Sequence, residues 1–309
     1  MSPLATPARH PGVVSYAGGV TLRGKGPRSS GLAALAGLAA LLVADRAEAF
    51  CRTTTSQVPA GYDPSTNGCW SQGKPLAWQV DSVPYGLQRA ASKQVSLADA
   101  TKVAHASFMA WNDVVCPGGP TRIEAFDNGP LTTQPGAGGC TNSNSCDPAQ
   151  DDVIVFDDTV WPHDDPYNTL ALTTVTYGVD DGRIFEAYTE VNSTKQLTVQ
   201  EPPPASSPAY DLQAILTHEA GHFLGLAHAA DSQSVMYALY SRGRIELTPD
   251  DVAGLCAIYP PAPQGCACST PPGSAGRPSL LFALAAGAIV YARRTRFLKK
   301  TSTDIRSSV

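Results

Sequence analysis

Residues 218–228 read HEAGHFLGLAH and decide how the rest of the chain is interpreted. Residues four apart share one face of a helix, so His218 and His222 are expected to point the same way, one turn apart. Gly225 can adopt a positive φ and end the helix, which lets His228 approach from another direction. Three neutral imidazoles around a tetrahedral zinc ion leave the fourth position open to water. That arrangement is typical of a catalytic zinc site, whereas structural sites are closed.

Glu219 follows the first of these histidines and is the expected general base, because it can take a proton from a water activated by zinc. HExxH alone also arises by chance on amphipathic helices, so the longer pattern HExxHxxGxxH carries the prediction. Further downstream come Asp231 and the segment SVMY, which contains Met236. Residues 247–255 then read LTPDDVAGL.

These motifs together resemble the metzincin zinc peptidases, and among them the matrixins (matrix-metalloproteinase-like, peptidase M10). The resemblance implies an α+β catalytic domain. Such a domain has a twisted mixed β-sheet, a long N-terminal helix, a zinc-binding active-site helix and a C-terminal helix. It also implies one catalytic zinc ion, protein or peptide substrates bound along a sheet edge, and Met236 as a thioether floor beneath the histidines.

Local patterns place the main elements. Ser96 can cap an amphipathic helix that continues to Val115. Strands are expected at 152–156, 170–177 and 183–191, which are rich in β-branched and aromatic residues. Residues 76–87 are expected to form only short β-like pieces, broken by Pro84 and Gly86.

Two further helices have recognisable N-termini. Asp211 can cap the zinc-binding helix. Thr248 is the expected N-cap of the last helix, with Pro249 in its first position and two aspartates near its positive end.

The acidic loop around residues 157–165 could hold calcium through Asp157, Asp158, Asp164 and Asp165, since calcium prefers oxygen ligands. A solvated acidic loop explains the same residues equally well. His105 is expected to lie on the surface or in packing. With six histidines in the chain, three of them assigned to catalysis, a second zinc ion is not expected.

The net charge of −5 and the lack of a basic stripe argue against nucleic-acid binding. The chain has eight cysteines, which are not arranged as paired CxxC knuckles and so suit disulfides in an oxidising compartment. Cys51 and Cys69 are plausible partners, as are Cys140 and Cys146.

Both ends of the chain suggest export. A basic leader, the apolar run 32–44 and the small residues around Ala49 fit a secretory signal. Near the other end, a Cys-Ala-Cys motif at 266–268 precedes an apolar run at 279–292 and a basic cluster. This combination resembles the C-terminal sorting tags of myxobacterial surface proteins, and a simple membrane anchor remains the alternative.

The sequence therefore predicts five regions and one function. The regions are a signal segment (1–49), a turn-rich flap (50–74), a matrixin-like domain (75–262), a Pro/Gly/Cys linker (263–278) and a hydrophobic and basic tail (279–309). The expected protein is a monomeric, secreted or surface-anchored zinc endopeptidase. The alternatives are a non-catalytic zinc-containing adhesion or binding protein on the same fold, and a metalloenzyme that does not act on peptides.

Overall fold

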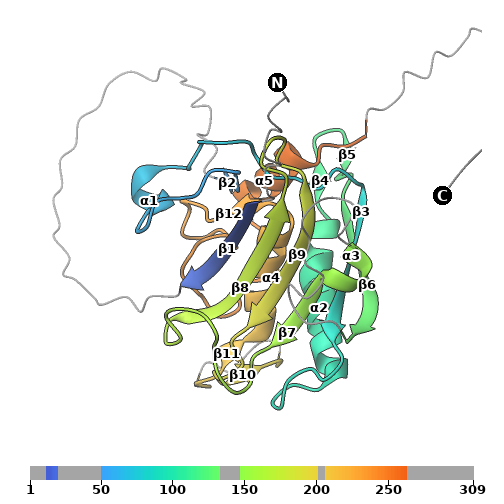
Figure 1. Ribbon diagram of the computed structural model, residues 1–309, viewed down its shortest axis with the longest axis vertical. Coiled ribbons are helices and arrows are strands. Elements are labelled where there is room, and N and C mark those ends of the chain that lie inside the picture. Colours follow the sequence, from blue (N-terminus) through green and yellow to red (C-terminus); the bar gives the residue numbers. More distant parts are fainter. Residues whose placement is uncertain (1–11, 20–49, 133–146, 201–205, 263–309) are drawn as a thin grey trace, which may run out of the picture. The chain divides into compact units, whose positions relative to one another are not determined.

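The computed structural model describes residues 50–132, 147–200 and 206–262, together with the backbone of residues 12–19 (Figure 1). A six-stranded mixed sheet has the order β1-β8-β9-β7-β3-β6. Its strands are β1 (Gly12–Gly19), β3 (Ser82–Gln88), β6 (Glu124–Leu131), β7 (Val153–Phe156), β8 (Thr169–Tyr177) and β9 (Ile184–Val191). Strands β6, β3, β7 and β9 are mutually parallel, whereas β8 runs antiparallel to β9 and β1 antiparallel to β8.

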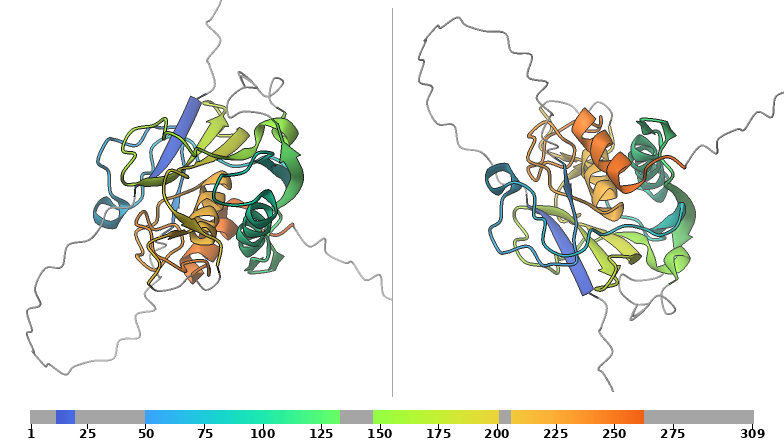
Figure 2. Two further views of the ribbon diagram at one scale, coloured as in Figure 1. Left: turned by 90° about the horizontal axis from the view of Figure 1, so that it is seen from below. Right: turned by 90° about the horizontal axis from the view of Figure 1, so that it is seen from above.

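Two helices, α2 (Leu97–Asn112) and α4 (Leu212–Phe223), lie on the same face of this sheet (Figures 1 and 2). Aromatic side chains join them: the rings of Phe108 and Phe223 lie 5.2 Å apart, edge to face. The buried indole of Trp111 donates a hydrogen bond to the Thr217 carbonyl at 2.8 Å. The core between helices and sheet thereby fixes α4, which carries the first two histidines.

The remaining elements are short, apart from the last helix, α5 (Pro249–Ile258). They are β2 (Cys51–Arg52), α1 (Pro64–Asn67), β4 (Val115–Cys116), β5 (Gly119–Pro120), α3 (Pro148–Asp151), β10 (Leu197–Thr198), β11 (Tyr210–Asp211) and β12 (Leu226–Ala227).

The local helix signals are confirmed. The side chains of Ser96, Asp211 and Thr248 each accept a backbone N–H in the first turn of α2, α4 and α5, respectively. The three expected strands are present as β7, β8 and β9. A long helix that begins at Leu97 and the helix that carries the first two histidines accompany a mixed sheet, as expected for an α+β domain.

The prediction that Pro84 and Gly86 interrupt a strand is wrong, because β3 runs through both. Pro84 lies opposite Phe126 of β6, and pairing with β7 begins only at Gly86. The missing N–H of Pro84 therefore costs no ladder bond on the β7 side. A Cβ at Gly86 would collide with the side chain of Leu131, so glycine allows β3 and β6 to approach closely. Strand β6 itself was not expected.

Two disulfides tie the described residues. The short-range disulfide, Cys51–Cys69, confirms the expected pair and spans 18 residues. The long-range disulfide, Cys116–Cys256, spans 140 residues and joins β4 to α5; nothing in the sequence indicated it. Cys140 and Cys146 lie outside the described residues.

Residues 12–19 fall inside the predicted signal segment, yet their backbone forms β1 and pairs with β8 along the sheet edge (Figure 2). Cleavage after Ala49 stays a prediction. The apolar runs 32–44 and 279–292 and the Cys-Ala-Cys motif lie outside the described residues. Among the described residues, no helix has the length and apolar character needed to cross a bilayer.

Candidate metal centre

Three histidine side chains converge at the C-terminal end of α4. His218 and His222 lie one turn apart on this helix, as their spacing predicts. Gly225 has a φ of +93°, which lets the chain turn back toward β12 and bring in His228. One ring nitrogen from each histidine lies within 4.8 Å of the others. In the part of the chain that the structure describes, this is the sole group of three or more such residues with that spacing.

Backbone carbonyls orient two of the rings. His218 Nδ1 lies 2.7 Å from the Val235 carbonyl oxygen, and His222 Nδ1 lies 2.9 Å from that of Leu226. Since a carbonyl can only accept, each Nδ1 carries the proton and each Nε2 of the neutral ring presents a lone pair. The Nε2 atoms of His218 and His228 are buried and have no hydrogen-bond partner among the described residues. Buried nitrogen lone pairs that converge in this way fit a zinc ion.

The protonation state of the histidines also fits metal binding. Burial lowers the pKa of His218 and brings that of His228 to about 3. Burial and the two neighbouring imidazoles hold the pKa of His222 well below its ordinary value. All three rings are therefore neutral near pH 7, which is the form that binds metal.

Glu219 lies beside the histidines and is 3% exposed. Its Oε2 accepts a hydrogen bond from the hydroxyl of Thr173 on β8 at 2.7 Å. Burial raises the pKa of Glu219 to about 8. A carboxyl group in this buried position next to three imidazoles is suited to proton transfer.

Met236 lies beneath α4, where it is buried at 2% exposure. A Cβ at Gly221 would collide with its sulfur atom and would approach the Trp111 ring, so glycine allows the thioether to reach the helix between the two histidines. The role of Met236 as a floor beneath the histidine rings stays a prediction. Sequence reasoning did not anticipate the role of Gly221, although a glycine inside a helical HExxH pattern is a signal of close packing.

Asp251 of α5 holds the chain around Met236. Its buried carboxylate accepts hydrogen bonds from the Ser234 hydroxyl and from the backbone N–H groups of Val235 and Met236. The same carboxylate closes a capping box with Thr248. The sequence indicated only the favourable position of Asp251 at the helix N-terminus, whereas the structure connects it to the carbonyl that orients His218.

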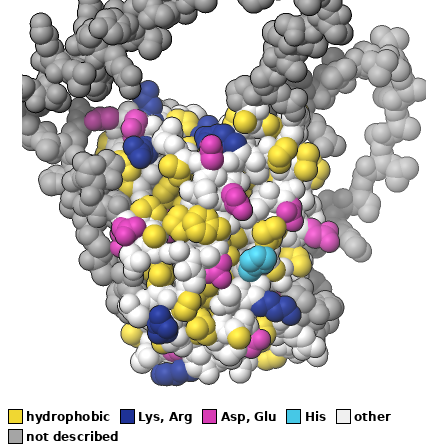
Figure 3. Space-filling view, turned by 90° about the vertical axis from the view of Figure 1, so that its right-hand side faces the viewer, with side chains coloured by type: hydrophobic (Ala, Val, Ile, Leu, Met, Phe, Trp, Pro, Cys, Tyr) yellow, Lys and Arg dark blue, Asp and Glu magenta, His cyan; other side chains and the backbone are white. Residues whose placement is uncertain are grey.

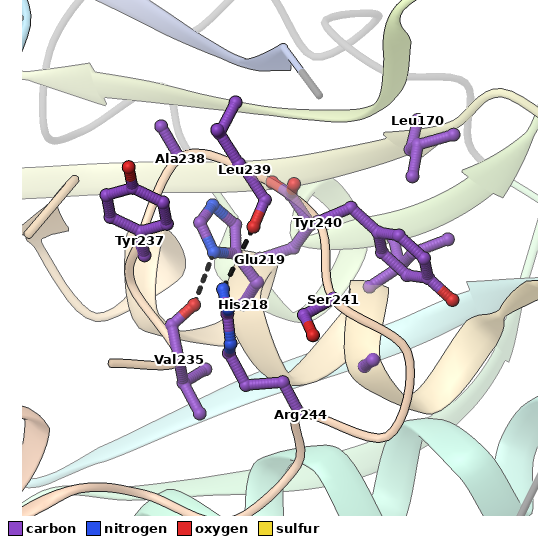
Figure 4. Close-up of a pocket in the computed structure, with 12 residues that line it drawn as sticks. Leu170, His218, Glu219, Val235, Tyr237, Ala238, Leu239, Tyr240, Ser241 and Arg244 are labelled. Atoms are coloured by element: carbon purple, nitrogen blue, oxygen red, sulfur yellow. Dashed lines mark hydrogen bonds between the residues drawn. The ribbon is translucent and has the colours of Figure 1, made fainter. Parts of the chain in front are cut away.

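A pocket opens beside His218 and Glu219 (Figure 4). Most of its lining is apolar; the residues are Leu170, Ala214, Ile215, His218, Glu219, Val235, Tyr237, Ala238, Leu239, Tyr240, Ser241 and Arg244. Arg244 donates hydrogen bonds to the carbonyls of Leu239 at 2.9 Å and Ser232 at 3.0 Å, and thereby fixes the loop that forms one wall. The pocket can hold an apolar side chain next to the reactive groups.

The four aspartates of the predicted calcium loop do not form one cluster. Asp158 accepts hydrogen bonds from Ser92 and from the backbone of Lys93, and Asp165 accepts from Asn168. Burial and the nearby Glu190 raise the pKa of Asp157 to about 6. Calcium binding by this loop stays a prediction.

Other charged groups lie outside the expected sites. The carboxylate of Glu190 pairs with the ring of His163 at 2.8 Å. His105 is exposed on α2, in agreement with a surface position. Asp152 and Glu186 are buried, and each has one carboxylate oxygen without a hydrogen-bond partner among the described residues. Sequence reasoning did not single out Asp152; the acidic residue directly before an apolar strand was the available signal. Lysine and arginine side chains are interspersed with acidic ones over the face in Figure 3.

Comparison with known proteins supports a metalloprotease. Residues 151–260 match the family model Matrixin, of peptidase family M10. Metalloendoproteinase 1-MMP of Arabidopsis thaliana is 45% identical over 62 residues, which cover 19% of this chain and 17% of that protein. Interstitial collagenase of Bos taurus is 44% identical over 54 residues, 17% and 12% of the two chains. The chain thus spans less than a fifth of the length of these relatives.

Proposed function

We propose that this protein is an exported zinc-dependent endopeptidase that hydrolyses peptide bonds of extracellular proteins. The observation that carries this proposal is the convergence of three imidazoles, one of them buried and two half-buried, beside a carboxylate and an apolar pocket. The matrixin match and the names of the relatives support the same class of enzyme.

His218, His222 and His228 would hold the zinc ion. Bound zinc supplies Lewis-acid chemistry, which makes a water molecule more acidic and polarises a carbonyl group. The carbonyls of Val235 and Leu226 keep two of the rings in the tautomer that this role requires.

Glu219 is the proposed general base. It takes a proton from the attacking water, and in its protonated form it delivers that proton to the departing amine nitrogen. Its burial favours the first step, because a carboxylate without surrounding water binds a proton readily. Met236 is proposed to support the histidine rings from below without touching the substrate.

The substrate is proposed to lie as an extended strand along β8 and to place one side chain in the pocket shown in Figure 4. Leu170, near the start of β8, lines this pocket together with Glu219. β1 now pairs with the outer edge of β8, so removal of the predicted signal segment would leave that edge open to a peptide.

The disulfides favour an oxidising compartment and hence export. We further propose that residues 263–309 attach the protein to the cell surface, that the protein acts as a monomer, and that the acidic loop around Asp157 binds calcium.

Glu219→Gln tests the proposal, because glutamine keeps the shape of the side chain but cannot accept the proton. Hydrolysis of casein or of a fluorogenic peptide by the purified protein should fall at least about a hundredfold, since general base catalysis contributes about 10²–10⁴. A chelator should also abolish activity, and added zinc should restore it. Glu124→Gln, on the exposed part of β6, is the matched control.

If the wild type cleaves no peptide, the endopeptidase proposal fails and a non-catalytic binding protein is favoured. If cleavage survives Glu219→Gln, the assigned base is wrong.

A further inference from the structure

The hydroxyl of Thr173 contacts the proposed base from the sheet side of the site. Its Oγ1 lies 2.7 Å from Glu219 Oε2, although 46 residues separate the two in sequence. Thr173 is fully buried in β8, and Glu219 is 3% exposed on α4. This hydrogen bond therefore links sheet and helix at the reacting carboxylate in a place from which bulk water is excluded.

A second hydroxyl lies behind the first. Thr189 of β9 is the cross-strand partner of Thr173, and their Oγ1 atoms lie 2.9 Å apart. Before it takes a proton, the proposed base is ionised and can only accept, so in that state Thr173 gives its single hydroxyl proton to Glu219. Thr189 then donates to Thr173.

The hydroxyl contact holds one oxygen of the carboxylate in place. Oε2 accepts the Thr173 hydroxyl, and a backbone hydrogen bond from Thr173 also favours the ionised form of Glu219. Both threonines are β-branched and held in strands, which restricts χ1 and therefore the positions of their Oγ1 atoms.

We propose that Thr173, supported by Thr189, is a positioning residue that fixes the orientation of the Glu219 carboxylate. This inference rests on the proposed function for its catalytic consequence, but the geometry that it describes does not. Neither threonine touches the substrate or the histidines in this scheme.

Thr173→Val removes the hydroxyl and preserves the branched shape. A misplaced catalytic group can cost about a hundredfold in rate. We expect kcat for a fluorogenic peptide to fall by about 10- to 100-fold, while KM stays within about twofold and zinc content is unchanged. Thr173→Ser restores the hydroxyl and should bring kcat back to within about threefold of the wild type.

Thr176→Val is the matched control. Thr176 is also buried in β8 and also donates to a carboxylate, that of Glu186 at 3.0 Å, but this carboxylate is not part of the histidine centre. The Thr176→Val variant should lose about as much stability as Thr173→Val, with no change in kcat. An equal loss of kcat in Thr176→Val, or a failure of serine to rescue, would overturn the positioning role.

Crystal structures of the full chain and of Thr173→Val, both loaded with zinc, provide a readout independent of activity. The Glu219 carboxylate should keep its contact in the wild type and rotate in the variant. If it is unmoved in the variant, or does not contact Thr173 in the wild type, the inference is wrong. A wild type that shows this contact but cleaves no peptide would instead refute the proposed function.

Discussion

Asp251→Asn should weaken the zinc centre without changing any residue in contact with the metal. Oδ2 of Asp251 accepts hydrogen bonds from the Val235 N–H at 2.9 Å and from the Thr248 N–H and hydroxyl at 2.8 Å each. Oδ1 accepts from the Ser234 hydroxyl and the Met236 N–H. An asparagine has a single acceptor oxygen, so one side of this arrangement must face an NH₂ group.

The asparagine side chain has two possible orientations. The one that costs less stability places its NH₂ group at the position of Oδ1. The Ser234 hydroxyl can then turn to accept, and the Met236 N–H keeps a bond to that hydroxyl at 2.9 Å. The bonds that remain are no longer assisted by a negative charge. With one or two buried donors affected at about 1–3 kcal/mol each, we expect the free energy of unfolding to fall by about 2–4 kcal/mol. Because Val235 orients His218, zinc affinity should fall by about 10- to 100-fold.

Urea unfolding of the metal-free protein measures the first effect, and competition with a chromogenic chelator measures the second. Asp99→Asn is the matched control. Asp99 also accepts a bond from an N-cap residue, Ser96, but it is exposed. This control should cost less than about 1 kcal/mol. If Asp251→Asn costs no more than the control, or leaves zinc affinity unchanged, the proposed link between α5 and the metal centre is wrong.

Three other predictions concern stability and access to the site. Replacing both cysteines of the long-range disulfide by alanine should cost about 5 kcal/mol in urea unfolding, against about 3 kcal/mol for the short-range disulfide, because loop entropy grows with the 140- and 18-residue separations; an equal or reversed order would contradict this reasoning. Burial raises the pKa of Asp152 well above its ordinary value, so the wild type should lose stability as pH rises above about 4, the pKa in the unfolded chain. In a chelating buffer Asp152→Asn should therefore gain about 1–3 kcal/mol at pH 8 and little at pH 4, and an unchanged pH dependence would count against it. A chain that starts at Phe50 should show about tenfold higher kcat/KM than a chain that retains residues 12–19, because β1 competes with the substrate for the β8 edge. A tenfold difference corresponds to about 1.4 kcal/mol. Equal values of kcat/KM, with mass spectrometry showing that the leader is still attached, would exclude that competition.

The sequence by itself determined the elements that depend on neighbours in the chain. The spacing of His218 and His222 follows from the helical period, and the turn to His228 follows from the positive φ that Gly225 allows. The caps of α2, α4 and α5 were also predictable, because an N-cap side chain bonds to N–H groups two or three residues away. These interactions extend over one or two turns, so a local pattern contains all the partners.

The tertiary structure decided the contacts that join distant segments. No local pattern indicates that Thr173 faces Glu219, that Asp251 holds the chain around Met236, or that Cys116 reaches Cys256. Pro84 is tolerated in β3 only because of where β7 begins to pair. Each of these outcomes depends on which strands and helices pack together. That choice is made by the burial of the whole core, and the residues at either end of a long-range contact do not encode it alone.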